Sequence, residues 1–180
     1  GLHRKEQCTG RMNLVDVQSN GGIHAPTIRY HNGKFYIITT NVYQPKKDEP
    51  AQMINFIITA SKPEGPWSEP IIVEGAPGID PDIFFDDDGK IYFTGTHAPK
   101  NPNFQGEGEI WIQELDSSSF QLKSERHFLW RGACQGTWAE GPHIYKKDGW
   151  YYLLIAEGGT SFNHAVMIAA SNNITGPYDA

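Results

Sequence analysis

One pattern occurs three times in the sequence, and this repeat limits the possible fold more than any other feature. Each copy reads Pro-x-Ile, then a turn glycine, then a strand rich in aromatic residues, and the copies begin near Ile23, Ile79 and Glu140. Several copies of one supersecondary unit are typical of folds in which neighbouring units stack on one another. The sequence therefore predicts a repeat protein.

Short runs of aromatic and β-branched residues, bounded by turn formers, predict strands throughout the chain. The runs are Lys34–Val42, Met53–Ala60, Ile91–Thr96, Glu109–Leu115, Trp150–Ala156 and Ala165–Ala170. No comparable amphipathic helix is evident in the sequence, so we predict an all-β fold.

Three joints between these runs carry the chemistry of tight turns. Residues 31–33, 87–89 and 147–149 each place Gly after a residue that tolerates a left-handed conformation, as short hairpins require. We predict hairpin tips at all three places. The acidic run 86–88 is then a solvated hairpin tip rather than a cation site.

A repeated four-stranded antiparallel unit of roughly fifty residues is typical of a β-propeller blade. Three such blades fit within 180 residues, whereas a closed ring needs about four to eight. The chain also begins at Gly1 without a Met and ends at Ala180 just after a turn. We expect a portion of a longer propeller; the alternatives are a β-sandwich and an open repeat array.

The formal net charge of -6 at pH 7 argues against nucleic acid or anionic membranes as partners, because both are held mainly by Lys and Arg. No apolar run is long enough to span a bilayer, and no signal region precedes the first strand. Cys8 and Cys134 favour two free thiols over one long-range disulfide, with both left open. A cytoplasmic and a secreted location are equally open.

Ionisable groups occupy nearly the same place in the three repeats. Residues 24–26 read His-Ala-Pro, residues 80–82 read Asp-Pro-Asp, and residues 140–142 read Glu-Gly-Pro. The innermost strands of a propeller line its channel, where neighbouring carboxylates feel each other's charge and lose part of their solvation. Two such carboxylates are the minimum equipment of most glycosidases. The alternative is that Asp80 caps a turn and Glu140 is a surface residue.

Four segments together resemble glycoside hydrolase family 43, which contains β-xylosidases and α-L-arabinofuranosidases. They are Gly-Gly-Ile-His-Ala-Pro at 21–26, Ile-Asp-Pro at 79–81 with Phe-Phe-Asp-Asp-Asp-Gly-Lys at 84–90, Glu-Gly-Pro-His-Ile-Tyr-Lys at 140–146, and Ala-Glu-Gly-Gly-Thr at 156–160. The resemblance covers nearly all of the chain.

The resemblance implies a five-bladed propeller that hydrolyses glycosidic bonds with inversion through three acidic residues. Glu140 matches the general acid, and Asp80, rather than Asp82, matches the residue that orients this acid and raises its pKa. The general base belongs to an Asp-Pro near the start of the first blade, which this sequence does not contain. We interpret Asp16 as structural. Residues 1–180 then form a partial propeller domain, roughly the second to fourth blades, that is inactive alone.

Further positions match groups that contact sugar in the family. His164 matches a His that points toward the channel, the alternative being a core His, and His24 replaces the Trp of many relatives. Trp138 and Phe162 are candidate platforms for the C–H face of a sugar ring. We expect Glu157 to support loop hydrogen bonds without a catalytic role.

The resulting hypothesis is a β-xylosidase or α-L-arabinofuranosidase acting on plant cell-wall oligosaccharides. We expect no required cofactor and no catalytic metal, with room for a structural cation near the channel. The competing hypotheses are a non-catalytic carbohydrate-binding propeller and, ranked last, a protein-interaction propeller. Sugar preference, endo or exo action and oligomeric state stay open.

Overall fold

A computed structural model describes residues 10–15, 17–44, 46–133 and 137–180. The interpretations of Cys8, Cys134 and Asp16 lie outside these residues. Strands dominate the described residues, which also include the short 3-10 helix η2 (Gly10–Met12). The all-β prediction is confirmed for this part of the protein.

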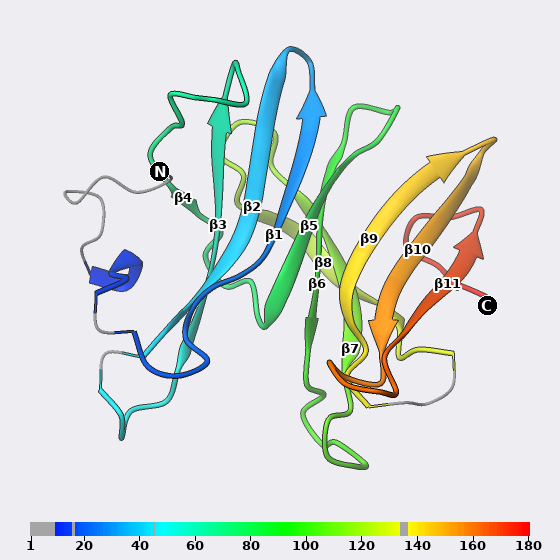
Figure 1. Ribbon diagram of the computed structural model, residues 1–180. Helices are drawn as coiled ribbons and strands as arrows, with labels where there is room; N and C mark the ends of the chain where they lie inside the picture. Colours follow the sequence, from blue (N-terminus) through cyan, green and yellow to red (C-terminus); the bar gives the residue numbers. More distant parts are fainter. Residues whose placement is uncertain (1–9, 16, 45, 134–136) are drawn as a thin grey trace.

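Three antiparallel sheets stand side by side along the chain (Figure 1). The first has the order β1 (Gly22–His31), β2 (Lys34–Tyr43), β3 (Gln52–Ala60) and β4 (Ile71–Ile72). The second has the order β5 (Ile79–Phe85), β6 (Ile91–His97), β7 (Glu109–Leu115) and β8 (Leu122–Trp130). The third comprises β9 (Glu140–Lys147), β10 (Trp150–Glu157) and β11 (Ala165–Ser171). The repeat in the sequence is thus a repeat of sheets.

All six runs predicted as strands form strands, β2, β3, β6, β7, β10 and β11, with ends within one residue of the predicted ones. β8 had no such signal, because six successive residues from Lys123 to Phe128 are exposed. An outermost strand with two solvated faces lacks the apolar alternation by which strands are found.

Two apolar layers join the sheets. The layer between the first and second sheets includes Ile38, Ile57, Ile83, Phe93 and Trp111. The layer between the second and third includes Ile110, Ile112, Ile144, Leu153 and Ile155. These side chains are almost completely buried, so sheet-to-sheet packing supplies the apolar burial that stabilises the array.

The hairpin predictions are confirmed, with one correction. Asn32 and Gly33 have φ of 46° and 78°, and Asp148 and Gly149 have φ of 53° and 81°, as a type I′ turn requires. In the third tip only Gly89 has a positive φ, 85°. The Gly89 N–H donates to the Asp86 carbonyl at 3.1 Å. This tip is therefore a wider turn, which does not need a left-handed residue before the glycine.

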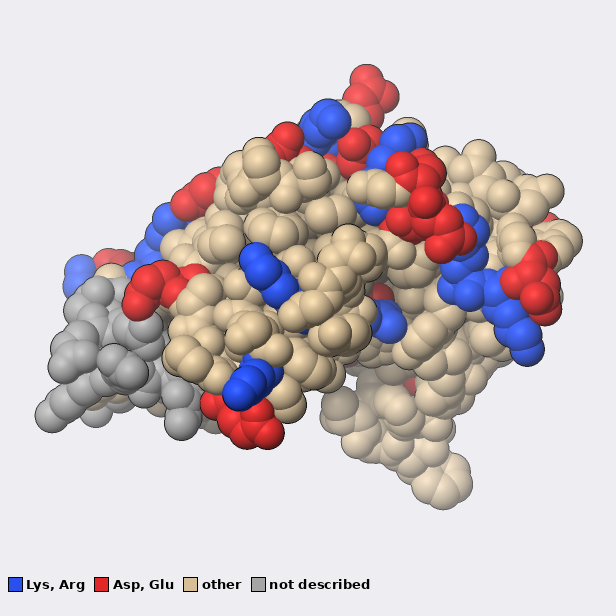
Figure 2. Space-filling model, turned by 90° about the horizontal axis from the view of Figure 1, so that it is seen from above, with Lys and Arg blue, Asp and Glu red and all other residues tan. Residues whose placement is uncertain are grey.

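The hairpin tips share one end of the array. Figure 2 looks down on this end and shows acidic and basic side chains interspersed. The beginnings of β1, β5 and β9 lie at the opposite end (Figure 1). Within the described residues, no helix has the length and apolar character needed to cross a membrane.

Candidate active site

The same backbone irregularity occurs near the start of β1, β5 and β9. His24 pairs with Thr40 and Thr27 with Ile38, so three steps on β1 oppose two on β2. β5 repeats this count between Ile79 and Asp82, and β9 repeats it between Glu140 and His143. Each innermost strand therefore carries one extra residue, a β-bulge, at an equivalent position.

Each bulge contains a left-handed residue followed by proline. Ala25, Asp80 and Gly141 have φ of 40°, 56° and 58°, and Pro26, Pro81 and Pro142 follow them. A left-handed backbone is uncommon for a residue with a side chain, although Asp adopts it more readily than most. Bulges of this kind redirect side chains and are frequent beside active sites.

Asp80 and Glu140 are brought together across two sheets. Asp80 Oδ2 accepts a hydrogen bond from the Gly141 N–H at 3.1 Å, directly after Glu140 in the chain. Both carboxylates are half-buried. This contact joins the start of β5 to the start of β9, next to Glu140.

Both groups have environments that favour the protonated form. Loss of solvation, and then the negative charge of Asp80, raise the pKa of Glu140 above its ordinary value. Loss of solvation also raises the pKa of Asp80, although the Gly141 N–H and the nearby His24 and His143 act in the opposite direction. A carboxyl group with a raised pKa is suited to giving a proton near neutral pH.

His24 lies near this pair, at the start of the bulge in β1. Its Nδ1 is 3.0 Å from the Gly22 carbonyl oxygen, so Nδ1 carries a proton and donates it there, which fixes the plane of the ring. The charge of His24 acts on Asp80 and favours the ionised form of that carboxyl group, which lowers its pKa. A contact of His24 with sugar stays a prediction.

Trp138 is held between two glycine-containing loops. Its N–H donates to the Gly106 carbonyl at 2.6 Å, and its indole ring lies against Gly106 and Gly159, where an added Cβ would come within 2.8 Å and 3.0 Å of ring atoms. The side chain is still 45% exposed. Trp138 is thus a fixed aromatic surface at the entrance to β9.

Phe162 and His164 lie in the loop between β10 and β11. Phe162 is fully exposed. The exposed His164 has Nδ1 2.7 Å from the carbonyl oxygen of Gly159, the glycine that also supports Trp138. His164 is therefore linked to the Trp138 surface through Gly159, and it is not a core histidine.

Glu157 ends β10 and behaves as expected from the sequence. Its carboxylate is buried and accepts the Ala133 N–H at 3.1 Å. The expected hydrogen bond to a loop is therefore present, at the Ala133 backbone.

The acidic run 86–88 needs a correction. Asp87 is 85% exposed and Asp88 49% exposed in their side chains, as expected for a solvated tip. Asp86 is buried and accepts hydrogen bonds at 2.6 Å from both Lys146 Nζ and Tyr151 Oη. Asp86 therefore joins the second sheet to the third, a role that its neighbours in sequence gave no sign of.

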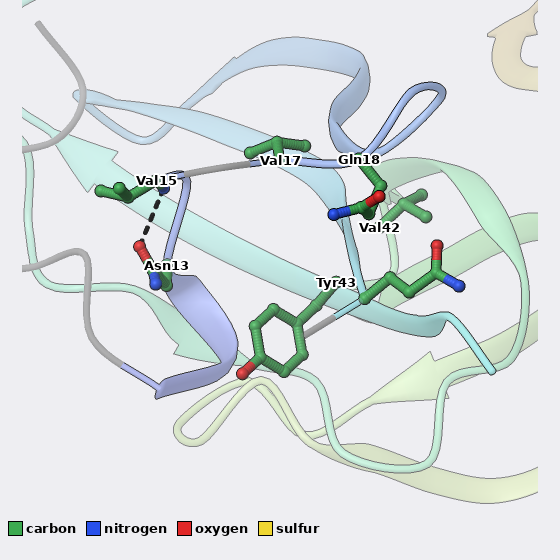
Figure 3. A pocket seen from close by; sticks show the side chains of 7 residues that line it. Asn13, Val15, Val17, Gln18, Val42 and Tyr43 are labelled. Atoms are coloured by element: carbon green, nitrogen blue, oxygen red, sulfur yellow. Dashed lines mark hydrogen bonds between the residues drawn. The ribbon is translucent and has the colours of Figure 1, made fainter. Parts of the chain in front are cut away.

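Several cavities among the described residues lie away from the carboxylates, including the following two. One of about 210 Å³ is lined by Asn13, Val15, Val17, Gln18, Val42, Tyr43 and Gln44; Figure 3 shows it, with the Val15 N–H donating to Asn13 Oδ1. The other, of about 530 Å³, is lined by Asn103, Phe104, Glu107, Phe128, Trp130, Arg131 and Gly132. Since neither includes Asp80 or Glu140, the candidate site rests on the geometry of its carboxylates. In the described part of the chain, no group of three or more His, Cys, Asp or Glu side chains is arranged to hold a metal ion.

The model of the family described as "Glycosyl hydrolases family 43" matches residues 2–180. A xylosidase/arabinosidase of Butyrivibrio fibrisolvens is 52% identical over 157 residues, which are 85% of this chain and 29% of that protein. A putative beta-xylosidase of Escherichia coli K12 is 41% identical over 94% of this chain and 32% of its own length.

Solved structures give the same result. A xylan beta-1,4-xylosidase from Bacillus halodurans superposes with a TM-score of 0.81 at 38% identity, over 91% of this chain and 31% of that one. A family 43 enzyme from a capybara gut metagenome has a TM-score of 0.78 at 38% identity, over 88% of this chain and 30% of its own. The chain thus spans about a third or less of the length of these relatives.

Proposed function

Since this chain belongs to glycosyl hydrolase family 43, we propose that the full-length protein is an inverting glycosidase. Its substrates are plant cell-wall oligosaccharides that contain xylose or arabinofuranose. The names of the similar proteins support this class of substrate, since they include xylosidase/arabinosidase, beta-xylosidase and xylan beta-1,4-xylosidase.

Glu140 is the general acid in this proposal. The observation that carries it is the pairing of Glu140 with Asp80 across two sheets, where burial and the Asp80 charge raise the pKa of Glu140. A protonated Glu140 gives its proton to the leaving glycosidic oxygen, and the resulting carboxylate is the product of that step. Asp80 orients the acid and keeps it protonated, because a second negative charge nearby disfavours ionisation.

The second half of the mechanism is the activation of water on the opposite face of the sugar by a carboxylate base. We assign no described residue to this role. Among the described acidic groups, Asp82 and Asp86 are occupied by ion pairs with Arg29 and Lys146, which makes both unsuitable as bases.

In this proposal, the sugar contacts come from Trp138, His24, His164 and Phe162. Trp138 offers a fixed and partly exposed indole face, which suits the C–H face of a pentose. His24 borders the carboxylates, while His164 and Phe162 extend the same region along the loop between β10 and β11. This arrangement needs no cofactor. A structural cation near the channel stays a prediction without an assigned set of ligands.

We also propose that the three sheets are blades two to four of a five-bladed propeller. Apolar side chains that face away from the second sheet support this at both ends of the array. Ile28 and Tyr30 on β1 are 54% and 63% exposed, and Val166 and Ile168 on β11 are 62% and 56% exposed. In a closed propeller such faces pack against the adjacent blades.

Replacing Glu140 by Gln in the full-length protein tests the proposal. We expect kcat/KM on xylo-oligosaccharides and arabino-oligosaccharides to fall by about a hundredfold to ten-thousandfold. The loss should be smaller on 4-nitrophenyl β-D-xyloside and α-L-arabinofuranoside, because their leaving groups need little protonation. Glu64→Gln, in an exposed turn, is the matched control and should keep full activity.

Proton NMR of the first product formed tests inversion, since a β-xyloside must release α-xylose. A folded full-length protein that cleaves none of these substrates would contradict the proposal. Binding of the same oligosaccharides without cleavage would identify the alternative, a non-catalytic carbohydrate-binding propeller.

A further inference from the structure

Asp82 is a charged group at the centre of the described array that the mechanism above does not use. Its side chain has no exposed surface. Arg29 of β1 donates through Nε to Oδ1 at 2.9 Å and through Nη2 to Oδ2 at 2.5 Å, and the Ile144 N–H of β9 donates to Oδ2 at 3.1 Å. One carboxylate thus links the innermost strands of all three sheets.

Arg29 adds to the connection with β9. Its guanidinium lies 5.0 Å from the centre of the Tyr145 ring, and Nη2 is 3.4 Å from the Ile144 carbonyl oxygen. A planar fork of this kind fixes direction as well as distance, because two parallel hydrogen bonds and a stacked ring constrain the guanidinium together.

The position of this pair along the strands connects it to the candidate acid. Asp80 and Asp82 lie two residues apart on β5, and they accept the N–H groups of Gly141 and Ile144, three residues apart on β9. The unequal spacing spans the bulge that redirects the chain beside Glu140. The Asp80 contact holds β9 within the bulge, at Gly141, and the Asp82 contact holds it just after the bulge, at Ile144.

We propose that Arg29 and Asp82 are positioning residues that set the reach of Glu140 toward the leaving oxygen. They act through β9 and touch no reacting atom. This inference rests on the proposed function, because it takes Glu140 as the general acid. A buried ion pair contributes little net stability compared with an apolar replacement, whereas a displacement of about 1 Å at a catalytic group costs about a hundredfold in rate.

The test uses Asp82→Asn and Arg29→Lys in the full-length protein. The Asn variant keeps the shape of the carboxylate and removes its charge, and the Lys variant keeps the positive charge and removes the fork. The readout is the ratio of kcat/KM on xylobiose to kcat/KM on 4-nitrophenyl β-D-xyloside. We expect this ratio to fall about tenfold to a hundredfold, because only the natural leaving group depends strongly on proton donation.

The matched control is Asp86→Asn. Asp86 and Lys146 form a different ion pair, 2.6 Å long, which joins the second sheet to the third. It lies at the ends of β5 and β9 that are opposite to their beginnings, where the carboxylates are (Figure 1). We expect this variant to lose stability and to leave the substrate ratio unchanged. Melting temperatures of all variants separate loss of folding from loss of positioning.

Each result has one reading. An unchanged ratio in folded Asp82→Asn and Arg29→Lys, while Glu140→Gln lowers it, would reject the positioning role and leave the proposed function standing. Failure of both variants to fold would also reject it, because the pair would then be a requirement of the fold. Absence of activity in the unmodified protein would instead reject the proposed function.

Discussion

The two ends of β5 and β9 use the same chemical group in opposite ways. At the beginning of these strands, Asp80 sits in a left-handed bulge with its pKa raised by burial. At the other end, Asp86 follows a regular strand, and hydrogen bonds from Lys146 and Tyr151 outweigh burial and lower its pKa. One end holds a carboxyl group that can carry a proton, and the other holds one that joins two sheets.

The difference lies in what surrounds each group. The Asp86 carboxylate has a cation and a phenol hydroxyl, each at 2.6 Å. The Asp80 carboxylate has one backbone N–H at 3.1 Å and shares its surroundings with Glu140. The charge of Asp86 is compensated by its partners, so this residue stays ionised and joins two sheets. The charge of Asp80 is only partly compensated, which suits a site of proton transfer.

Asp80→Asn should have the largest effect on activity. It removes the carboxyl group with the raised pKa and leaves only the paired Asp86 at the other end of the strands. We expect kcat/KM on xylobiose to fall about a hundredfold. Because the Asp80 charge raises the pKa of Glu140, its removal should lower that pKa, and the alkaline limb of the pH profile should move to lower pH. A profile of kcat/KM against pH measures both effects, and an unshifted limb would contradict the role of Asp80.

Asp86→Asn should reduce stability by about 2 kcal/mol, because a buried hydrogen-bonded charge loses its counterpart. The pKa of Asp86 is lowered in the folded state, so its contribution is present above the unfolded pKa of about 4 and disappears as pH falls through the folded value. Urea unfolding at neutral and acidic pH should show the difference shrinking below about pH 4.

Asp88→Asn is the comparison for this stability measurement. Asp88 is in the same hairpin, half-exposed and 3.5 Å from Lys90 Nζ, and an exposed pair of this kind contributes little to stability. A loss as large as that of Asp86→Asn would show that the hairpin, rather than the joint between sheets, determines the result.

Gly106→Ala should have a smaller effect than Asp80→Asn on activity, confined to the site. An added Cβ would lie 2.8 Å from the Trp138 ring, at a φ of 82°, so the indole must move. We expect KM for xylo-oligosaccharides to rise about threefold to tenfold, the range of a lost aromatic contact. Gly33→Ala has a similar φ of 78° in open space; it should cost about 1 kcal/mol of stability and leave KM unchanged.

The sequence was sufficient for the strands whose side chains alternate or pack on both faces. It also predicted the hairpin at Asn32–Gly33, since the turn type is encoded in those two residues. β8 was not predicted because its exposed residues show no apolar periodicity. The sequence therefore predicted a strand or a turn only where burial or turn geometry restricts the residue types at neighbouring positions.

The site was predictable to the same extent. Asp80 and Glu140 were found from their place before or beside a proline in repeated units, and the structure brings them together. Nothing near Asp82 or Asp86 in the sequence indicated that their partners are Arg29, Lys146 and Tyr151. These contacts join different sheets, and the separation of 53 residues between Arg29 and Asp82 leaves no local pattern to read.

Because β1, β5 and β9 share the same bulge, each of these innermost strands can carry a reactive side chain at the same place in its sheet. Asp80 is equivalent to Ala25 and Gly141, which also have a positive φ, whereas Glu140 lies one position earlier and is equivalent to His24 and Ile79. Two adjacent positions of the bulge can therefore carry a reactive side chain, and the residue at each position decides which sheet supplies the chemistry. A change of catalytic layout within such a scaffold requires new side chains at these two positions and no new path for the chain.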